Sequence, residues 1–325
     1  MRALRIILWR LASAGPTLLL VALGVFVLIE SAPGDAADAY LAQTGGDAGF
    51  AEALRQRLGL GGTFADRLIR FGGRLASGDL GASYVFSRPV GDVILERLPV
   101  TLLLMACAVS IAALLGLGLG LLAGARPGSA RDRALSGLAL AVLAMPSFWL
   151  ALVLVLAFGV WLPWLPVSGL RTIGAVQSTL DAALDMARHL VLPAFALGLG
   201  YVALYMRTLR AGMVGQWRSA HVRAAQARGI SDASVVLRQV ARPALLPVAV
   251  LVGQQAGALF GGSVVVETVF GIPGMGRLAY EAVAGRDTLL LAGVVLAGAT
   301  LVIAANLLVD LLLVRLDPRI GAGEA

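Results

Sequence analysis

Six long apolar runs constrain this chain more than any other feature of its sequence. A helix crosses the apolar core of a bilayer, about 30 Å thick, with roughly 20 mostly apolar residues. The runs lie at 11–29, 99–123, 134–162, 189–208, 243–266 and 288–314. Only 14% of the 325 residues are charged, against about 25% in an ordinary soluble domain. The sequence therefore predicts an all-α polytopic membrane protein with six transmembrane helices.

The third run is longer than one straight crossing requires. Pro146 lies inside it and predicts a kink or a tilt, because proline cannot continue the hydrogen-bond ladder of a helix. Trp161 lies at the end of the run, and Trp164 follows it closely. Such aromatic residues gather at membrane interfaces, so we place the end of this helix there.

The arginines predict which side of the membrane each loop occupies. All 26 basic residues are arginine. The N-terminus and the 124–133 turn carry three each, and the 207–242 loop carries seven arginines and one acid. Since positively charged loops resist translocation, we expect these three segments and both termini to be cytoplasmic, with 31–98 extracytoplasmic. A cleavable signal peptide is the alternative for the first run, although its length exceeds the usual 7 to 15 apolar residues.

Composition excludes several kinds of site. A nucleotide-binding P-loop and a Schiff-base enzyme both need a lysine, and the chain has none. Cys107 is the only cysteine, so neither an internal disulfide nor a thiolate cluster can form. His189 and His221 are too few for most zinc sites. The sequence also lacks HExxH and GxSxG motifs. We therefore expect no catalytic residue, no metal and no cofactor on this chain.

Two runs contain glycines at four-residue intervals. Small residues with this spacing share one helix face and let two helices approach closely. We interpret the two sets as helix-packing seams, either within the bundle, or against a partner subunit, or where helices slide during gating. The sets are Gly116, Gly120 and Gly124 in the second run, and Gly253, Gly257 and Gly261 in the fifth.

Few polar residues interrupt the runs. The candidates for lining a pathway or for gating are Gln254, Gln255, Glu267, Asn306 and Asp310. Glu267 and Asp310 lie near the ends of their runs, where a capping or interhelical bond is the simpler interpretation. No relay of carboxylates lies deep in the membrane. This absence disfavours a secondary transporter or channel that works alone, which is the alternative function.

Two amphipathic stretches flank the runs. Phe64, Leu68, Phe71 and Leu75 form one arc and three arginines another, which predicts a short helix on the bundle or on the membrane surface. Docking to a soluble partner is the alternative for it. A second stretch, 180–189, ends at His189, which we interpret as an interfacial residue rather than a ligand.

The arginine-rich loop contains a short stretch of small residues. Residues 220–229 predict a helix ended by Gly229, and a second helical stretch covers 232–240 before Pro243 and Pro247 open the fifth run. An alanine face between arginines suits close approach by another protein. Anionic lipid headgroups would explain the arginines equally well, but not the spacing of alanine, glycine and proline.

This loop resembles the EAA motif of ABC importer permeases. Ala224, Ala225 and Gly229 are in register with the motif, residues 246–247 close it, and Arg223 stands where the motif's name puts glutamate. Other short segments also match the pattern of these permeases, in the same order and along nearly the whole chain. They lie at 32–35, 78–83, 88–90, 96–102, 146–149, 165–169, 267–276 and 316–319. The ordered set resembles the first of the two permease subunits of dipeptide, oligopeptide and nickel-type ABC importers.

The resemblance implies a type I ABC importer permease in the bacterial inner membrane. A single permease domain over 1–325 would contain the extracytoplasmic segment 31–98 and a cytoplasmic coupling loop over 207–246. The implied partners are a homologous second permease, two cytoplasmic ATPases that hold ATP and Mg, and an extracytoplasmic binding protein, besides membrane lipid and without nucleic acid. The transported solute stays open between dipeptides, longer peptides, nickel chelates and other small solutes.

The resemblance also implies which residues couple transport to ATP. The expected ATPase-coupling residues are Arg223, Ala224, Ala225, Arg228 and Gly229. The alanines and the glycine would allow close approach of an ATPase, and the two arginines would make polar contacts with it.

Overall fold

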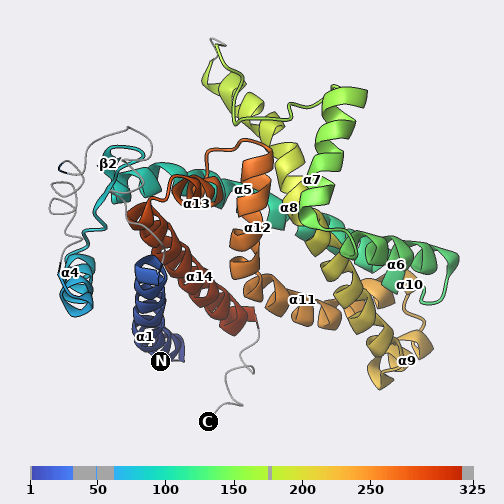
Figure 1. Cartoon of the computed structure of the whole chain (residues 1–325). Coiled ribbons are helices and arrows are strands. Elements are labelled where there is room, and N and C mark those ends of the chain that lie inside the picture. The colour runs from blue at the N-terminus through green and yellow to red at the C-terminus, as the bar shows by residue number, and fades with distance from the viewer. Residues whose placement is uncertain (1, 32–48, 50–61, 175–177, 317–325) are drawn as a thin grey trace. The chain divides into compact units, whose positions relative to one another are not determined.

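All six predicted spans lie on helices of the computed structural model (Figure 1). The structure describes residues 2–31, 49, 62–174 and 178–316. Two short strands, β1 (Ala82–Ser83) and β2 (Arg88–Pro89), pair antiparallel. The helices are α1 (Arg2–Ser31), α4 (Phe64–Ala76), α5 (Val90–Gly124), α6 (Ala130–Leu143), α7 (Ser147–Leu156), η1 (Ala157–Trp161), α8 (Thr179–Trp217), α9 (Ala220–Ala227), α10 (Asp232–Ser234), η2 (Val235–Ala241), α11 (Arg242–Gln254), α12 (Ala256–Val269), α13 (Met275–Ala284) and α14 (Thr288–Leu316).

Length and apolarity identify the helices that can cross a membrane. Within the described residues, four stretches qualify alone: Val90–Gly124, Thr179–Trp217, Asp232–Gln254 and Thr288–Leu311. A fifth qualifies only if the bent pair Ala130–Leu143 and Ser147–Trp161 is one span. Two further apolar helices, Ala12–Leu28 and Gly257–Val269, are shorter than these spans. This architecture is compatible with the predicted six spans.

The third predicted span is broken rather than gently kinked. α6 ends at Leu143, and α7 begins at Ser147 with Pro146 as its N-cap. The two helices are bent by 102°. Proline has no N–H to extend the ladder of α6, whereas it is well tolerated at the start of a helix. The predicted position of the bend is therefore confirmed, and the bend is sharper than expected.

The fifth predicted span, 243–266, is not one helix, so that prediction was wrong. α11 ends at Gln254 and α12 begins at Ala256, with Gln255 at the break. Upstream, the helical path continues through η2 and α10 back to Asp232. Pro243 therefore does not open this span. The helical path tolerates it because it lies in the first turn of α11, where a missing N–H costs little.

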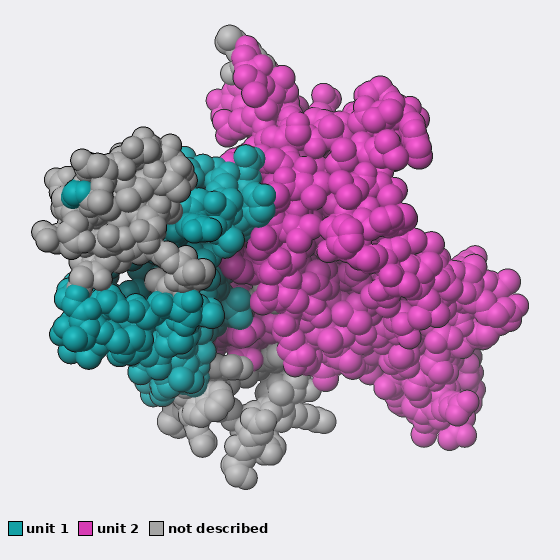
Figure 2. Space-filling model, in the orientation of Figure 1, with its two compact units in different colours: residues 1–100, 274–304 teal, residues 101–273, 305–325 magenta. Residues whose placement is uncertain are grey.

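Packing divides the chain into two compact units, coloured separately in Figure 2. The first comprises residues 1–100 and 274–304, and the second comprises 101–273 and 305–325. The second unit contains α6 to α12 and therefore the whole arginine-rich loop.

In the first unit, α4 packs on α1. The ring centroids of Phe64 and Phe71 lie 5.3 and 5.4 Å from that of Phe26. Arg67 forms an ion pair with Glu30. The predicted amphipathic helix over 64–75 is confirmed, and α1 receives part of its apolar arc.

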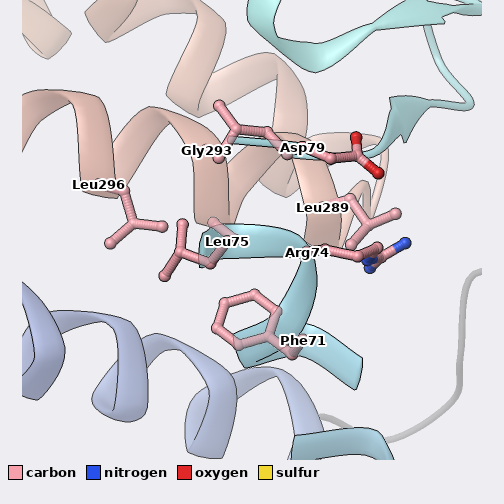
Figure 3. Close-up of a pocket in the computed structure, with 9 residues that line it drawn as sticks. Phe71, Arg74, Leu75, Asp79, Leu289, Gly293 and Leu296 are labelled. Atoms are coloured by element: carbon pink, nitrogen blue, oxygen red, sulfur yellow. The ribbon is translucent and has the colours of Figure 1, made fainter. Parts of the chain in front are cut away.

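A small hollow lies between α4 and α14 (Figure 3). Its apolar wall includes Phe71, Leu75 and Leu296, while the charged ends of Arg74 and Asp79 both lie on one side of it, apart from each other. The volume of about 10 Å³ is enough for one water molecule at most. The hollow is thus a gap in helix packing and has no room for a transported solute.

Asp287 fastens the β1–β2 hairpin to the start of α14. Its carboxylate is fully buried. Ser83 Oγ donates to Oδ2 at 2.6 Å, and the backbone N–H of Leu290 donates to Oδ1 at 3.0 Å. Beside it, burial raises the pKa of Tyr84 to about 12, and the nearby Asp287 carboxylate adds to that shift. One side chain therefore both caps a helix and holds a hairpin.

We expect Asp287→Ala to loosen this hairpin. The change leaves the buried Ser83 hydroxyl without its acceptor, and a buried polar group that loses its partner costs about 1 to 3 kcal/mol. Hydrogen exchange at the amides of 82–88 should then accelerate by about tenfold. Asp92→Ala, which removes an exposed carboxylate from the first turn of α5, is the control. Equal exchange in the two variants would contradict this role of Asp287.

In the second unit, α5 and α8 approach each other along glycines. A Cβ atom at Gly116 would lie 2.9 Å from Val202 O, and one at Gly120 would lie 2.9 Å from Met206 O. At Gly124 the nearest atom would be the Met213 sulfur, at 2.6 Å. The structure thus places the seam of the second run inside the chain.

The glycines of the fifth run do not share one helix face, contrary to our expectation. Gly253 lies near the end of α11, where an added Cβ would overlap the Val309 side chain of α14. Gly257 and Gly261 belong to α12, and a Cβ at Gly261 would meet nothing within 4 Å. The break at Gln255 removes the common helical register on which the expectation depended.

Candidate functional site

The arginine-rich loop folds into α9, a short helix that packs on its own unit. α8 continues past the predicted end at Thr208 to Trp217, and α9 covers Ala220–Ala227. Val222 and Ala225 are fully buried in a cluster that also contains Val235 and Val240 of η2. One face of α9 is therefore fixed against α8 and η2.

The opposite face of α9 is exposed. Ala220, Arg223, Ala224 and Ala227 are all exposed, and their spacing of three and four residues places them on one side of a helix. Three of the four are alanines. The exposed face is therefore shallow, and another molecule can approach its backbone closely.

The structure distinguishes among the alanines that the motif singled out. Ala224 is exposed as expected, whereas Ala225 is fully buried and contributes to the internal cluster. Close approach of a partner to Ala225 is therefore not available in this conformation. Ala220 and Ala227 were missed, although their spacing from Ala224 was readable as a helical stripe.

Gly229 ends α9 in the left-handed conformation, with a φ of +73°. The N–H of Gly229 donates to Gln226 O at 2.9 Å, and the N–H of Ile230 donates to Ala225 O at 3.3 Å. These two bonds form a Schellman motif, which satisfies the last carbonyl groups of the helix. The predicted glycine stop is confirmed.

His221 ties the start of α9 to η2. Its Nε2 lies 3.1 Å from Gln239 O, to which it donates in the protonated-Nε2 tautomer. The contact therefore joins the first turn of α9 to η2. Sequence reasoning missed this contact because it joins residues 18 positions apart.

The surface around α9 is basic. Its exposed arginines include Arg218, Arg223, Arg228, Arg238 and Arg242, and Asp232 is also exposed. Arg228 Nε donates to Ala224 O at 3.2 Å, so its guanidinium stays near the end of the helix. Arg210, counted with this loop, is instead bonded to Asp132 of α6.

The polar candidates within the spans have different environments. Glu267 is fully buried and accepts a 2.7 Å bond from Thr101 Oγ1, which joins α12 to α5. Gln254 is exposed and Gln255 half-buried at the break. Asn306 and Asp310 are half-buried on α14. The interhelical bond agrees with the simpler interpretation of Glu267, and the pathway roles stay predictions.

Some expectations fall outside the described residues, namely the motif pieces 32–35 and 317–319. Within the described part of the chain, no three His, Cys, Asp or Glu side chains are grouped so that they could hold a metal ion.

His189 is buried and lies 2.8 Å from Asp185 O of its own helix. His189 is therefore packed inside its own unit, and its place at the membrane interface stays a prediction.

Comparison with known proteins decides the class of this chain. Residues 116–322 match the family described as "binding-protein-dependent transport system inner membrane component". The chain belongs to this family. The permease resemblance found in the sequence is thus confirmed, and the protein is a multi-pass inner-membrane permease subunit of an ABC importer and not itself an enzyme.

The permease is similar to curated proteins over nearly its whole length. It is 37% identical over 322 residues to a Brucella ovis protein provisionally named a peptide permease, covering 98% of this chain and 99% of the relative. It is 36% identical to the di/tripeptide transport system permease protein of Pseudomonas aeruginosa and to the glutathione transport system permease protein of Pectobacterium atrosepticum. Each comparison covers 96% of this chain and 97% of the relative. In such importers a permease works with a second permease, an ATPase and a binding protein.

Proposed function

We propose that this permease carries short peptides across the inner membrane and that an ATPase subunit drives it by binding the exposed face of α9. The solute class rests on the relatives, which are named for peptides, for di/tripeptides and for glutathione, itself a tripeptide. Their common chemistry is a chain of a few amide-linked residues.

The proposed assembly contains four kinds of subunit. A homologous second permease forms the other half of the translocation pathway, an extracytoplasmic binding protein delivers the solute, and two cytoplasmic ATPases hold ATP and Mg. The chain has no lysine with which to build a P-loop, so the nucleotide is expected on the ATPases. The basic segments, α9 among them, and both termini face the cytoplasm in this arrangement.

The observation that carries the coupling proposal is the division of α9 into two faces. Val222 and Ala225 anchor the helix to its own unit, while the alanine stripe with Arg223 stays exposed. ATP can shift a two-state bundle only through contacts that differ between the two states. A shallow helix fixed on one side transmits such contacts directly, and Arg223 and Arg228 supply polar groups for carboxylates of the ATPase.

Site-specific photo-crosslinking tests this coupling. We expect p-benzoylphenylalanine at Ala224 or Ala227 to form an adduct with the ATPase subunit in inner-membrane vesicles that contain the assembled importer. The same residue at Leu180, which is exposed at the start of α8, should give no such adduct. Adducts with lipid alone from both α9 positions would instead assign the arginines to anionic headgroups and contradict the proposal.

Calorimetry on the cognate binding protein tests the solute class separately. We expect heat of binding with dialanine or with glutathione and none with a nickel–histidine chelate. Binding of the chelate alone would overturn the peptide assignment and leave the coupling proposal untouched.

A further inference from the structure

We propose that Asp132 and Arg210 are positioning residues for coupling, because their ion pair makes α6, α8 and α9 move as one body. The inference deepens the proposed function and rests on it, since it concerns how movement of α9 reaches the membrane helices. The pair lies entirely within the second unit.

The Asp132 carboxylate is buried and receives four hydrogen bonds. The side chain is 1% exposed. The Arg210 guanidinium donates through Nε to Oδ1 and through Nη2 to Oδ2, the latter at 2.8 Å. The N–H of Gly128 donates to Oδ2 at 2.8 Å, and Ser136 Oγ donates to Oδ1 at 3.2 Å. Such a two-pronged bond fixes orientation as well as distance.

The turn between α5 and α6 is built around this carboxylate. Gly128 has a φ of +79°, a conformation that glycine adopts readily. Ser129 caps α6 by accepting from the N–H of Asp132 at 3.2 Å. Arg133 Nη1 donates to Gly128 O at 2.7 Å. The position of Asp132 therefore sets the shape of the whole turn.

A second bond holds the other end of the same turn. Trp217 Nε1 donates to the carbonyl of Gly124, the last residue of α5, at 2.9 Å. Trp217 follows Arg210 by seven residues, which places both on one face of α8. Along that face, α8 is thus bonded to the end of α5 through Trp217 and to the first turn of α6 through Arg210.

These two contacts lie close in sequence to α9. Trp217 is the last residue of α8, and only Arg218 and Ser219 separate it from α9. His221 fixes the start of α9 to η2. A displacement of α9 therefore reaches Trp217 and Arg210 without passing through a long flexible linker.

The charges also indicate a positioning role. Arg210 belongs to the segment with seven arginines, and Asp132 belongs to the 124–133 turn with three. Two segments of like net charge would repel each other, yet this pair joins them. The pair is part-buried, because the Arg210 side chain is 33% exposed and that of Asp132 is 1% exposed. Such a pair adds little net stability, but removal of Arg210 leaves the buried Asp132 charge without its partner. Its main effect here is to hold α6 and α8 in one relative position.

Spin-label distance measurements on the complete importer in lipid nanodiscs test the inference. In a Cys107→Ala background, labels at Gln226→Cys on α9 and Leu138→Cys on α6 report the distance between these exposed positions. We expect the same distance distribution without nucleotide and after trapping with ATP and vanadate. A wild-type distance that changes on trapping would overturn the rigid link, even if the photo-adduct at Ala224 confirms coupling.

Variants of the pair supply the second arm. Arg210→Gln should shift or broaden that distribution on trapping and lower peptide-stimulated ATP hydrolysis about tenfold, with the ATPase still co-purifying. Arg210→Lys keeps the charge but not the two-pronged bond, so its ATP hydrolysis should lie between those of Arg210→Gln and the wild type. Glu96→Gln, which breaks the exposed Arg88–Glu96 pair, should match the wild type. Unchanged distances and stimulation in Arg210→Gln would overturn the proposal, whereas absent adducts from α9 would overturn only the coupling on which it rests.

Discussion

Gly229→Glu should abolish the stimulation of ATP hydrolysis by the peptide-loaded binding protein, while the permease still inserts into the membrane. Gly229 has a φ of +73°, and a residue with a Cβ pays about 1 to 2 kcal/mol for that conformation. A Cβ there would meet nothing within 4 Å, so the cost is conformational rather than steric. Relief of that strain unwinds the end of α9, and the new carboxylate competes for Arg223 and Arg228.

A graded series at the same position separates conformation from charge. Gly229→Asn should keep most of the stimulation, because asparagine tolerates left-handed backbone better than other residues with a Cβ. Gly229→Ala should lose part of it without adding charge. Stimulation is measured as phosphate release by the reconstituted importer, and membrane insertion by extraction from washed membranes. Full stimulation in the Glu variant would contradict the assignment of α9.

Gly120→Val should prevent the permease from reaching a stable folded state. A Cβ at Gly120 would lie 2.9 Å from the backbone oxygen of Met206 and 3.0 Å from Leu209 Cβ. Because a backbone atom blocks the space, α5 and α8 must separate. Overpacking typically costs about 1 to 3 kcal/mol, and here separation also weakens the neighbouring contacts at Gly116 and Gly124.

Gly118→Val is a matched control for this prediction. Gly118 lies on the same helix, two residues away, and a Cβ there would meet nothing within 4 Å. We expect the Gly120 variant to aggregate at a clearly lower temperature than the wild type, or to be lost during detergent extraction. The Gly118 variant should follow the wild type in size-exclusion chromatography after heating. Equal behaviour of the two variants would contradict close packing of α5 on α8.

Local sequence patterns were sufficient for the placement of most helices. An apolar run of about 20 residues reports its environment without reference to distant residues, so the spans over 99–123, 189–208 and 288–314 lie on α5, α8 and α14. α4 and α9 were predictable for a related reason. The apolar and polar residues of α4 recur with the period of a helix, whereas α9 is a stretch of small residues that ends at Gly229.

The breaks in the spans were less readable. Pro146 predicted an irregularity in the third span but not its size, which is a bend of 102°. The angle depends on what the following helix packs against. At Gln255 the chain carries no proline, and the apolar composition on both sides favoured a continuous helix. The division of the fifth run therefore could not be read from composition alone.

The sequence by itself determined that this chain crosses a membrane and that residues 220–229 contain a short alanine-rich helix, and its ordered motifs resembled those of importer permeases. The first two conclusions rest on hydropathy and residue spacing, which are properties of neighbouring residues, and the third rests on likeness to the motifs of a known family. Only the tertiary structure decided that Ala225 is buried while Ala224 is exposed, because η2 covers one face of α9. It also decided that Arg210 bonds to Asp132. Those two residues are 78 positions apart, and only the packing of α6 on α8 brings their opposite charges together.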